Sequence, residues 1–363
     1  MRLLKSLLLV LSLLLLGACG VKQQSPRAAT AAASAPVIAT PYSGRSPHPR
    51  ILVSYDMEGL GGISDWRLWE SRYPDSFVKG QQLLAGELNA VVDGLFAGGT
   101  SAVEVFDQHG SGRPDTQPDM PAELLDARAH EVLMSEIVTA QSQEEHRYDA
   151  VVTIGGHSRA GNGGFASHTV SSGAAVVANG IALTEVSLIA YQWGENGVPL
   201  IMAAGTDTLG DDLKDFPWIE YVTVKRTRTA AEAELLPLDE VHAQLRAAAQ
   251  RAVRNIAHAR IVVLAAPITI TVSSVPPGDL SELQGIPGVH YADGHVTFEA
   301  PRLNPEGASG LVALSGFAQR SGQQQLLRDV VIERPDGAAM LMKGADLYIT
   351  RWLDHESSLR KRD

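Results

Sequence analysis

Residues 51–62 have the sequence ILVSYDMEGLGG, in which a short aliphatic run changes abruptly into acidic residues and glycines. The aliphatic part has the length and composition of a buried strand in a parallel sheet. Asp56 and Glu58 follow it directly, and in extended backbone residues two positions apart point to the same side. Two carboxylates held together in this way favour a cation between them. The alternative for a lone Asp-x-Glu is a solvated loop or a helix cap.

The same pattern of an aliphatic run followed by polar residues or glycines recurs along the chain. The strands that we expect are 51–55, 102–106, 150–154 and 200–204. A predicted helix, 77–96, lies between the first two, has aliphatic residues at a period close to 3.6, and ends at Gly98. A second helix is predicted over 239–257, followed by a strand-like stretch over 261–272. This order predicts an α/β fold of three layers, α/β/α, with a mostly parallel sheet and a smaller mixed C-terminal subdomain.

The first 18 residues have the features of a lipoprotein signal peptide. Arg2 and Lys5 precede an apolar run over 7–16, and two small residues then precede Cys19. The run is about half the length that spans a bilayer. We therefore expect cleavage before Cys19 and lipid attachment to it, with the protein anchored to the outer membrane and facing the periplasm. Cys19 is the only cysteine, so no intrachain disulfide can form.

The composition changes again after the signal peptide. Residues 19–49 are rich in Ala, Ser, Pro, Gln and Thr, which predicts a flexible tether behind the lipidated Cys19. We expect a metal-binding catalytic α/β core over 50–235, and a C-terminal α/β portion of the same unit over 236–363. The formal net charge is −11 at pH 7, which argues against nucleic acid as a partner.

Ionisable side chains follow three of the predicted strands. Asp56 and Glu58 follow the first strand, Asp107 and His109 the second, and His157 the third. The carboxyl ends of parallel strands meet at one edge of a sheet, so these side chains should converge. Carboxylate and imidazole together predict zinc, with manganese or cobalt as alternatives. For Asp107 two roles stay open, that of a metal ligand and that of a residue orienting His109.

Three motifs are specific in combination, namely Asp56-Met57-Glu58-Gly59, Asp107-Gln108-His109 and Gly155-Gly156-His157. Further stretches follow in order: Ser158-Arg159-Ala160, Ser167-His168, Thr184-Glu185, Val224-Lys225, Ile286-Pro287-Gly288 and Val296-Thr297-Phe298. In order and spacing they resemble the motifs of the zinc-dependent D-aminopeptidase family over most of the chain. Phe106 and Gln108 depart from the family pattern, in which small polar residues are more usual. These departures leave the ligand positions intact and concern the substrate preference.

The resemblance implies two zinc ions per subunit, bridged by Asp56 and held by Asp56, Glu58, His109, His157 and Glu185. Glu185 follows from the resemblance alone, because within the apolar stretch 183–190 we would otherwise expect an ordinary exposed helix position. His168 resembles the family's active-site histidine that is not a ligand, which implies oxyanion stabilisation or proton transfer. Lys225 ends a predicted strand, where lysine is usually solvated, and we expect no catalytic role for it.

The implied activity is hydrolysis of short peptides with an N-terminal D-amino acid by a water activated between two metal ions. Peptidoglycan-derived peptides are candidate substrates in the cell envelope. The resemblance also implies a ring-shaped homo-oligomer. Two other functions stay open. One is a non-catalytic lipoprotein that captures a metal or a peptide, and the other is a different metal-dependent hydrolase, such as a phosphoesterase or deacylase.

Overall fold

The computed structural model describes residues 36–44, 46–113, 116–137, 147–171, 174–275, 280–312, 314–315 and 334–360. They belong to one unit, Ala35–Asp363. The predicted signal peptide and Cys19 lie outside the described residues. Within the described part, no helix combines the length and the hydrophobicity needed to cross a membrane.

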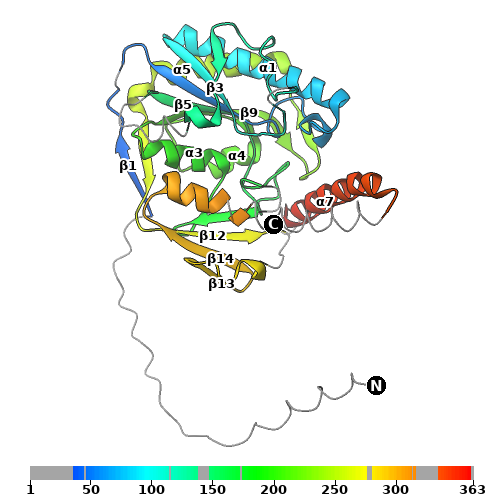
Figure 1. Cartoon of the computed structure of the whole chain (residues 1–363). Coiled ribbons are helices and arrows are strands. Elements are labelled where there is room, and N and C mark those ends of the chain that lie inside the picture. Colours follow the sequence, from blue (N-terminus) through cyan, green and yellow to red (C-terminus); the bar gives the residue numbers. More distant parts are fainter. Residues whose placement is uncertain are drawn as a thin grey trace, which may run out of the picture. The chain divides into compact units, whose positions relative to one another are not determined.

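A seven-stranded sheet forms the centre of this unit, with the strand order β10-β9-β8-β5-β2-β3-β4 (Figure 1). Its strands are β2 (Arg50–Tyr55), β3 (Ala102–Asp107), β4 (Ala129–Glu131), β5 (Ala150–Gly156), β8 (Leu200–Thr206), β9 (Glu220–Thr227) and β10 (Ala233–Leu235). All neighbours are parallel except β10, which runs antiparallel to β9 at the edge. The mostly parallel sheet predicted from the aliphatic runs is therefore confirmed.

Helices cover both faces of this sheet. The helices α1 (Pro74–Gly98) and α5 (Leu238–Arg254) pack together on one face, and α3 (Glu185–Gly194) and α4 (Asp207–Asp212) lie on the other (Figure 1). Alternate residues of β2 enter different cores, since Ile51 and Val53 pack in the cluster that contains α1 while Leu52 packs in the cluster that contains α3. This alternation explains why the consecutive residues Ile51, Leu52 and Val53 are all aliphatic.

A second, antiparallel sheet has the order β13-β14-β12-β6-β7. Its strands are β6 (Ala174–Ala178), β7 (Ile181–Ala182), β12 (Ile268–Ser274), β13 (Val289–Ala292) and β14 (His295–Ala300). Val176 of β6 and Ile270 of β12 pack in the same apolar cluster as α3. The smaller sheet thus combines strands from the middle and from the C-terminal part of the chain.

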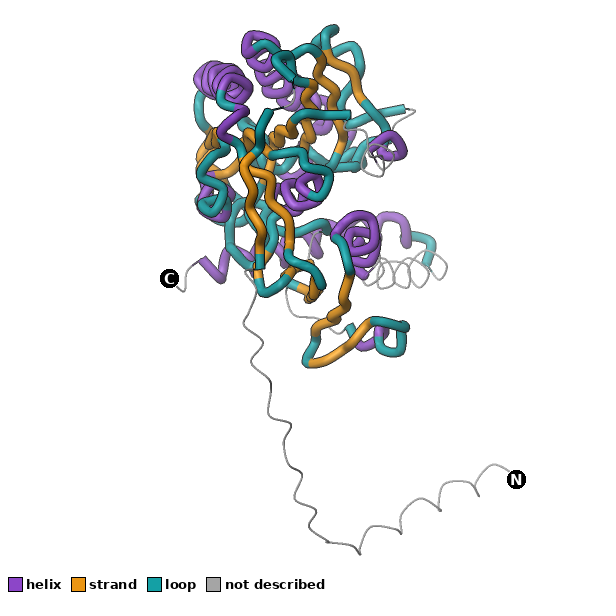
Figure 2. The backbone as a smooth tube through the Cα atoms, turned by 90° about the vertical axis from the view of Figure 1, so that its left-hand side faces the viewer, coloured by secondary structure: helices purple, strands orange, loops and turns teal. Residues whose placement is uncertain are grey.

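The segment before β2 differs from the expected tether. β1 (Val37–Pro41) pairs antiparallel with β11 (Arg260–Leu264), and the two strands run side by side in Figure 2. Tyr42 is buried, and its amide donates to the carbonyl of Ala259 at 3.0 Å. The amino-acid composition does not indicate this strand, because the strand is held by backbone pairing with β11 and most of its side chains are exposed. The prediction of a flexible tether reaching residue 49 was therefore wrong for 37–42.

The helix boundaries agree closely with the sequence pattern. α1 has Pro74 in its first turn and is capped at its C-terminal end by Gly99, whose φ of 108° is the left-handed conformation that favours glycine. The strand-like stretch 261–272 is two strands, β11 and β12. The remaining elements are the short helices η1 (Trp66–Leu68), η2 (Ile256–His258), η3 (Ser281–Leu283) and η4 (Leu303–Gly307), and the C-terminal helix α7 (Gly337–Arg360).

Candidate metal centre

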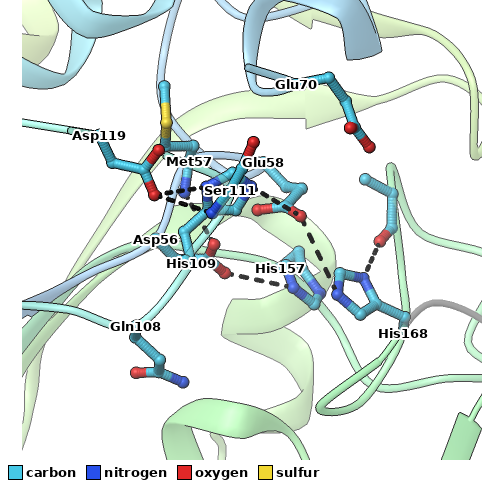
Figure 3. Close-up of polar contacts among 12 residues, drawn as sticks. Asp56, Met57, Glu58, Glu70, Gln108, His109, Ser111, Asp119, His157 and His168 are labelled. Atoms are coloured by element: carbon cyan, nitrogen blue, oxygen red, sulfur yellow. Dashed lines mark hydrogen bonds and ion pairs between the residues drawn. The ribbon is translucent and has the colours of Figure 1, made fainter. Parts of the chain in front are cut away.

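The predicted site residues come together at the carboxyl edge of the central sheet. Asp56 and Glu58 follow β2, His109 follows β3, and His157 follows β5, the strand next to β2. Glu185 is the first residue of α3, and His168 lies in the loop between β5 and β6. Figure 3 shows the histidine rings and the carboxylates of Asp56 and Glu58 facing one another. The ligand roles of Asp56, Glu58, His109, His157 and Glu185 and the catalytic role of His168 stay predictions.

Close backbone packing shapes the two loops that carry the acids and His157. The amide of Gly59 donates to the carbonyl of Gly155 at 2.7 Å, and the amide of Asp56 donates to Ile154 at 3.0 Å. A Cβ atom at Gly59 would lie 1.9 Å from the carbonyl oxygen of Gly156, so only glycine fits. The glycines in these two motifs therefore let the loops approach closely enough to share one site.

Donor atoms form two overlapping groups that share His157. In each group all atoms lie within 4.8 Å of one another: one contains Asp56, Glu58 and His157, and the other His157, His168 and Glu185. The Nε2 atom of His157 is 3.3 Å from Asp56 and 3.7 Å from Glu185. His109 lies beside the first group, because its Nε2 atom is 3.6 Å from the carboxylate of Glu58. These overlapping groups are candidate sets of metal ligands.

Each histidine is oriented by a partner at its other ring nitrogen. The Nδ1 atom of His157 is 3.1 Å from the Ser158 carbonyl, and that of His168 is 2.8 Å from the Ala166 carbonyl. A carbonyl only accepts, so Nδ1 is the donor in both contacts, and in the neutral imidazole Nε2 then carries the lone pair. Zinc-binding histidines have this arrangement.

The donor chemistry fits a divalent cation. Oε2 of Glu58 and Nε2 of His157 are buried and have no hydrogen-bond partner among the described residues. His157 Nε2 is near the Asp56 carboxylate, but the approach lacks hydrogen-bond geometry. Buried lone pairs without donors are costly, and a cation coordinated by them removes that cost. The mixture of carboxylate and imidazole is the one that zinc prefers.

The close packing of charged groups in the site also shifts their pKa values. Burial, followed by the charge of Glu58, raises the pKa of Asp56 well above its usual value. Burial alone would raise the pKa of Glu58, but His109, a hydrogen bond with Asp56 and the charges of His168 and His157 together outweigh burial and lower that pKa. Burial and the neighbouring His157 lower the pKa of His168. Carboxylates and imidazoles bind a metal ion in their deprotonated forms. A metal ion that binds to these side chains therefore displaces the protons they share.

Lys225 is fully buried beneath the loop that carries the acids, contrary to the expected solvated position. Its Nζ atom donates to the carbonyls of Glu58 at 2.5 Å and Ile63 at 2.7 Å, and lies 4.1 Å from the ring centre of Phe165. Burial lowers the pKa of Lys225 to about 7. The expectation failed because the loop after β2 crosses over the end of β9, which local sequence does not reveal. Lys225 therefore positions Glu58 through its backbone.

Glu87 of α1 is a second buried support that the sequence pattern did not predict. Its carboxylate accepts a hydrogen bond from the amide of Gly61, and burial raises the pKa of Glu87 to about 8. Glu87 stands between Leu84 and Leu88 on the buried face of α1. The sequence feature that could have predicted this role is an acidic residue at a position of the helix that faces the core.

Asp119, rather than Asp107, orients His109. The Oδ2 atom of Asp119 is 3.1 Å from His109 Nδ1 and also accepts from the amide of Ser111. Asp107 instead accepts from the amide of Gly110 at 2.9 Å, and belongs to neither donor group. Asp119 lies ten positions beyond His109 in an irregular loop. It could not be predicted from the residues that directly follow the strands.

Gln108, one of the departures from the family pattern, holds Glu185. Its Oε1 atom accepts from the Ser54 hydroxyl at 2.9 Å, and its Nε2 atom donates to Glu185 Oε2 at 3.4 Å. The other carboxylate oxygen of Glu185 accepts from the amide of Val170 at 2.7 Å. Glu185 is therefore oriented into the site and is not an ordinary exposed helix residue.

Replacing Asp119 by asparagine should weaken zinc binding about tenfold or more, because the imidazole of His109 loses a charged partner that orients it. Zinc titration of the stripped protein measures this effect. Asp107→Asn is the matched control and should weaken binding less. An equal or larger loss in Asp107→Asn would restore Asp107 as the residue that orients His109.

Comparisons with known proteins cover most of the chain. The model of a family described as D-aminopeptidase matches residues 50–305. A solved structure, the Zn-dependent D-aminopeptidase DppA from Bacillus subtilis, described as a self-compartmentalizing protease, is similar with a TM-score of 0.67 and 21% identity. The match covers 75% of this chain and 98% of that one. No curated protein matches the chain.

Proposed function

Because the chain belongs to the D-aminopeptidase family, we propose that it is a zinc-dependent enzyme that removes an N-terminal D-amino acid from short peptides. The family match confirms the predicted class, an aminopeptidase. The observation that carries the metal dependence is the convergence of buried imidazole and carboxylate groups at the edge of the sheet. The zinc dependence of DppA supports zinc as the metal.

We propose that Asp56, Glu58, His109, His157 and Glu185 hold two zinc ions. The clustered donor groups support a metal site at these residues, and the number of two ions is what the family resemblance implies. When bound, zinc supplies Lewis acidity toward a peptide carbonyl and toward water. The protein's own contribution is to fix Glu58 through Lys225, His109 through Asp119 and Glu185 through Gln108.

His168 is proposed as the catalytic residue. Its Nδ1–H donates to the Ala166 carbonyl, so its Nε2 atom is the proton acceptor that faces the site. That atom lies 3.6 Å from Glu185 and 4.0 Å from Glu58. His168 is therefore placed to take a proton during attack on the peptide carbonyl, or to donate to the oxyanion once protonated.

We further propose a location in the cell envelope, with lipid on Cys19 and the enzyme on the periplasmic side of the outer membrane. The signal-peptide pattern supports this location, and D-amino acids in peptidoglycan peptides would then be within reach. The description of DppA as self-compartmentalizing supports a homo-oligomer. The segment between Cys19 and β1 would let several anchored subunits reach one membrane.

The function is tested with protein lacking residues 1–19, assayed on matched D-Ala and L-Ala dipeptides and amides. We expect the zinc-loaded protein to cleave the D-series preferentially, and EDTA-stripped protein and Glu58→Ala to lose activity. Turnover of phosphoesters or acylated amines without peptide cleavage would favour the other hydrolase classes. Metal or peptide binding without any turnover would favour a receptor and overturn the proposal.

A further inference from the structure

The C-terminal helix α7 lies beyond the part of the chain that matches the family, yet it reaches the candidate active site. The indole of Trp352 meets the ring of His168 edge to face, with 5.6 Å between centroids and an interplanar angle of 89°. The ring of His157 also contacts His168. The two rings are stacked, with 4.0 Å between centroids and an interplanar angle of 16°. His168 is thus in contact with one ring from the family core and one from α7.

One turn further along α7, a buried carboxylate fixes the loop that carries His168. Glu356 is fully buried and accepts from the amides of Gly161 at 3.1 Å and Gly163 at 3.0 Å, and from the Ser167 hydroxyl at 2.8 Å. All three donors lie within seven residues before His168. Hydrogen bonds to a buried charge are stronger than those between neutral groups, so they hold this glycine-rich loop in one conformation.

A second connection runs from α7 to the carbonyl that orients His168. The Ser357 hydroxyl accepts from the amide of Ala230 at 3.0 Å, and the carbonyl of Ala230 accepts from the amide of Ala166 at 2.9 Å. Ala166 has a φ of 51°, a left-handed conformation that costs a non-glycine residue free energy. Its carbonyl is the acceptor for His168 Nδ1. The contacts of α7 therefore stabilise a strained residue on which the direction of His168 depends.

We propose that α7 positions the catalytic histidine, with Glu356 fixing the loop and Trp352 fixing the ring of His168. The catalytic role of His168 in this proposal rests on the proposed function. A helix that only stabilised the fold would not need a buried carboxylate, because apolar packing stabilises without the cost of desolvating a charge. The hydrogen bonds of Glu356 instead converge on the one loop that presents His168.

The test compares Glu356→Gln, Trp352→Ala and Trp352→Phe with Asp354→Asn, which removes an exposed carboxylate from the same helix. We expect Glu356→Gln and Trp352→Ala to lower kcat about tenfold to a hundredfold with little change in KM or zinc content, because the nucleophilic step depends on how His168 is aligned. Trp352→Phe should keep most of the activity, since it keeps an aromatic edge. Asp354→Asn should behave as wild type.

Hydrogen exchange of the peptide containing residues 159–167 gives a readout independent of activity. Glu356→Gln should speed exchange there, because the amides of Gly161 and Gly163 lose a charged acceptor. Should Glu356→Gln fail to fold, Ser167→Ala removes a single donor and should show smaller changes in the same direction. Unchanged exchange, or faster exchange with unchanged kcat, would overturn the proposal. If wild-type protein cleaves no peptide, the proposed function fails, and unchanged exchange would then reject the positioning role separately.

Discussion

Replacing His168 by alanine is expected to lower kcat about a thousandfold, the effect of losing a general acid or base, while the zinc content stays that of the wild type. The expectation follows from the position of Nε2, which faces Glu58 and Glu185 while Nδ1 is occupied by the Ala166 carbonyl. Steady-state kinetics on a D-Ala dipeptide and metal analysis of the same sample measure both quantities.

The zinc content decides between two roles for His168. Its donor atom belongs to the same group as those of His157 and Glu185, so a ligand role is geometrically open. Loss of one zinc ion together with activity in His168→Ala would make it a ligand and contradict the catalytic assignment. His295→Ala, on the exposed part of β14, is the matched control and should change neither quantity.

Lys225→Met should lower the free energy of unfolding by about 2 kcal/mol, the cost of leaving two buried carbonyls without their hydrogen-bond donor. Methionine retains most of the side-chain volume, so the loss comes mainly from the carbonyls of Glu58 and Ile63, which lose their donor. The loop that carries Asp56 and Glu58 should then hold zinc more weakly. Denaturant unfolding of the stripped protein and zinc titration measure the two effects.

Lys214→Met is the control for this comparison, because Lys214 is an exposed lysine paired with Asp211 on the surface. Exposed ion pairs of this kind contribute less than about 1 kcal/mol, so its stability should stay near that of the wild type. If Lys225→Met were as stable as Lys214→Met, the buried lysine would not support the metal-site loop.

The parts of the fold that the sequence predicted share a physical cause. The strands β2, β3, β5 and β8 have side chains buried on both faces, which makes them rich in aliphatic residues, and α1 has one apolar face and a glycine at its end. Because neighbouring strands are parallel, the residues that follow them had to lie at one edge. The proximity of Asp56, Glu58, His109 and His157 could therefore be predicted from local patterns.

The supports of the site could not be predicted in this way, because they come from distant segments. Lys225, Asp119 and Glu356 act through loops that pack against the site, and nothing in their own neighbourhood marks them as buried. Glu185 required the family resemblance, since its immediate sequence suggests only a helix. β1 escaped notice for another reason: backbone pairing leaves little trace in composition.

Whether this edge of the sheet binds two zinc ions is decided by anomalous scattering at the zinc absorption edge from crystals of zinc-loaded protein. We expect two peaks per chain, both beside the side chains of Asp56, Glu58, His109, His157 and Glu185. A single peak, or peaks away from these residues, would refute the two-zinc site.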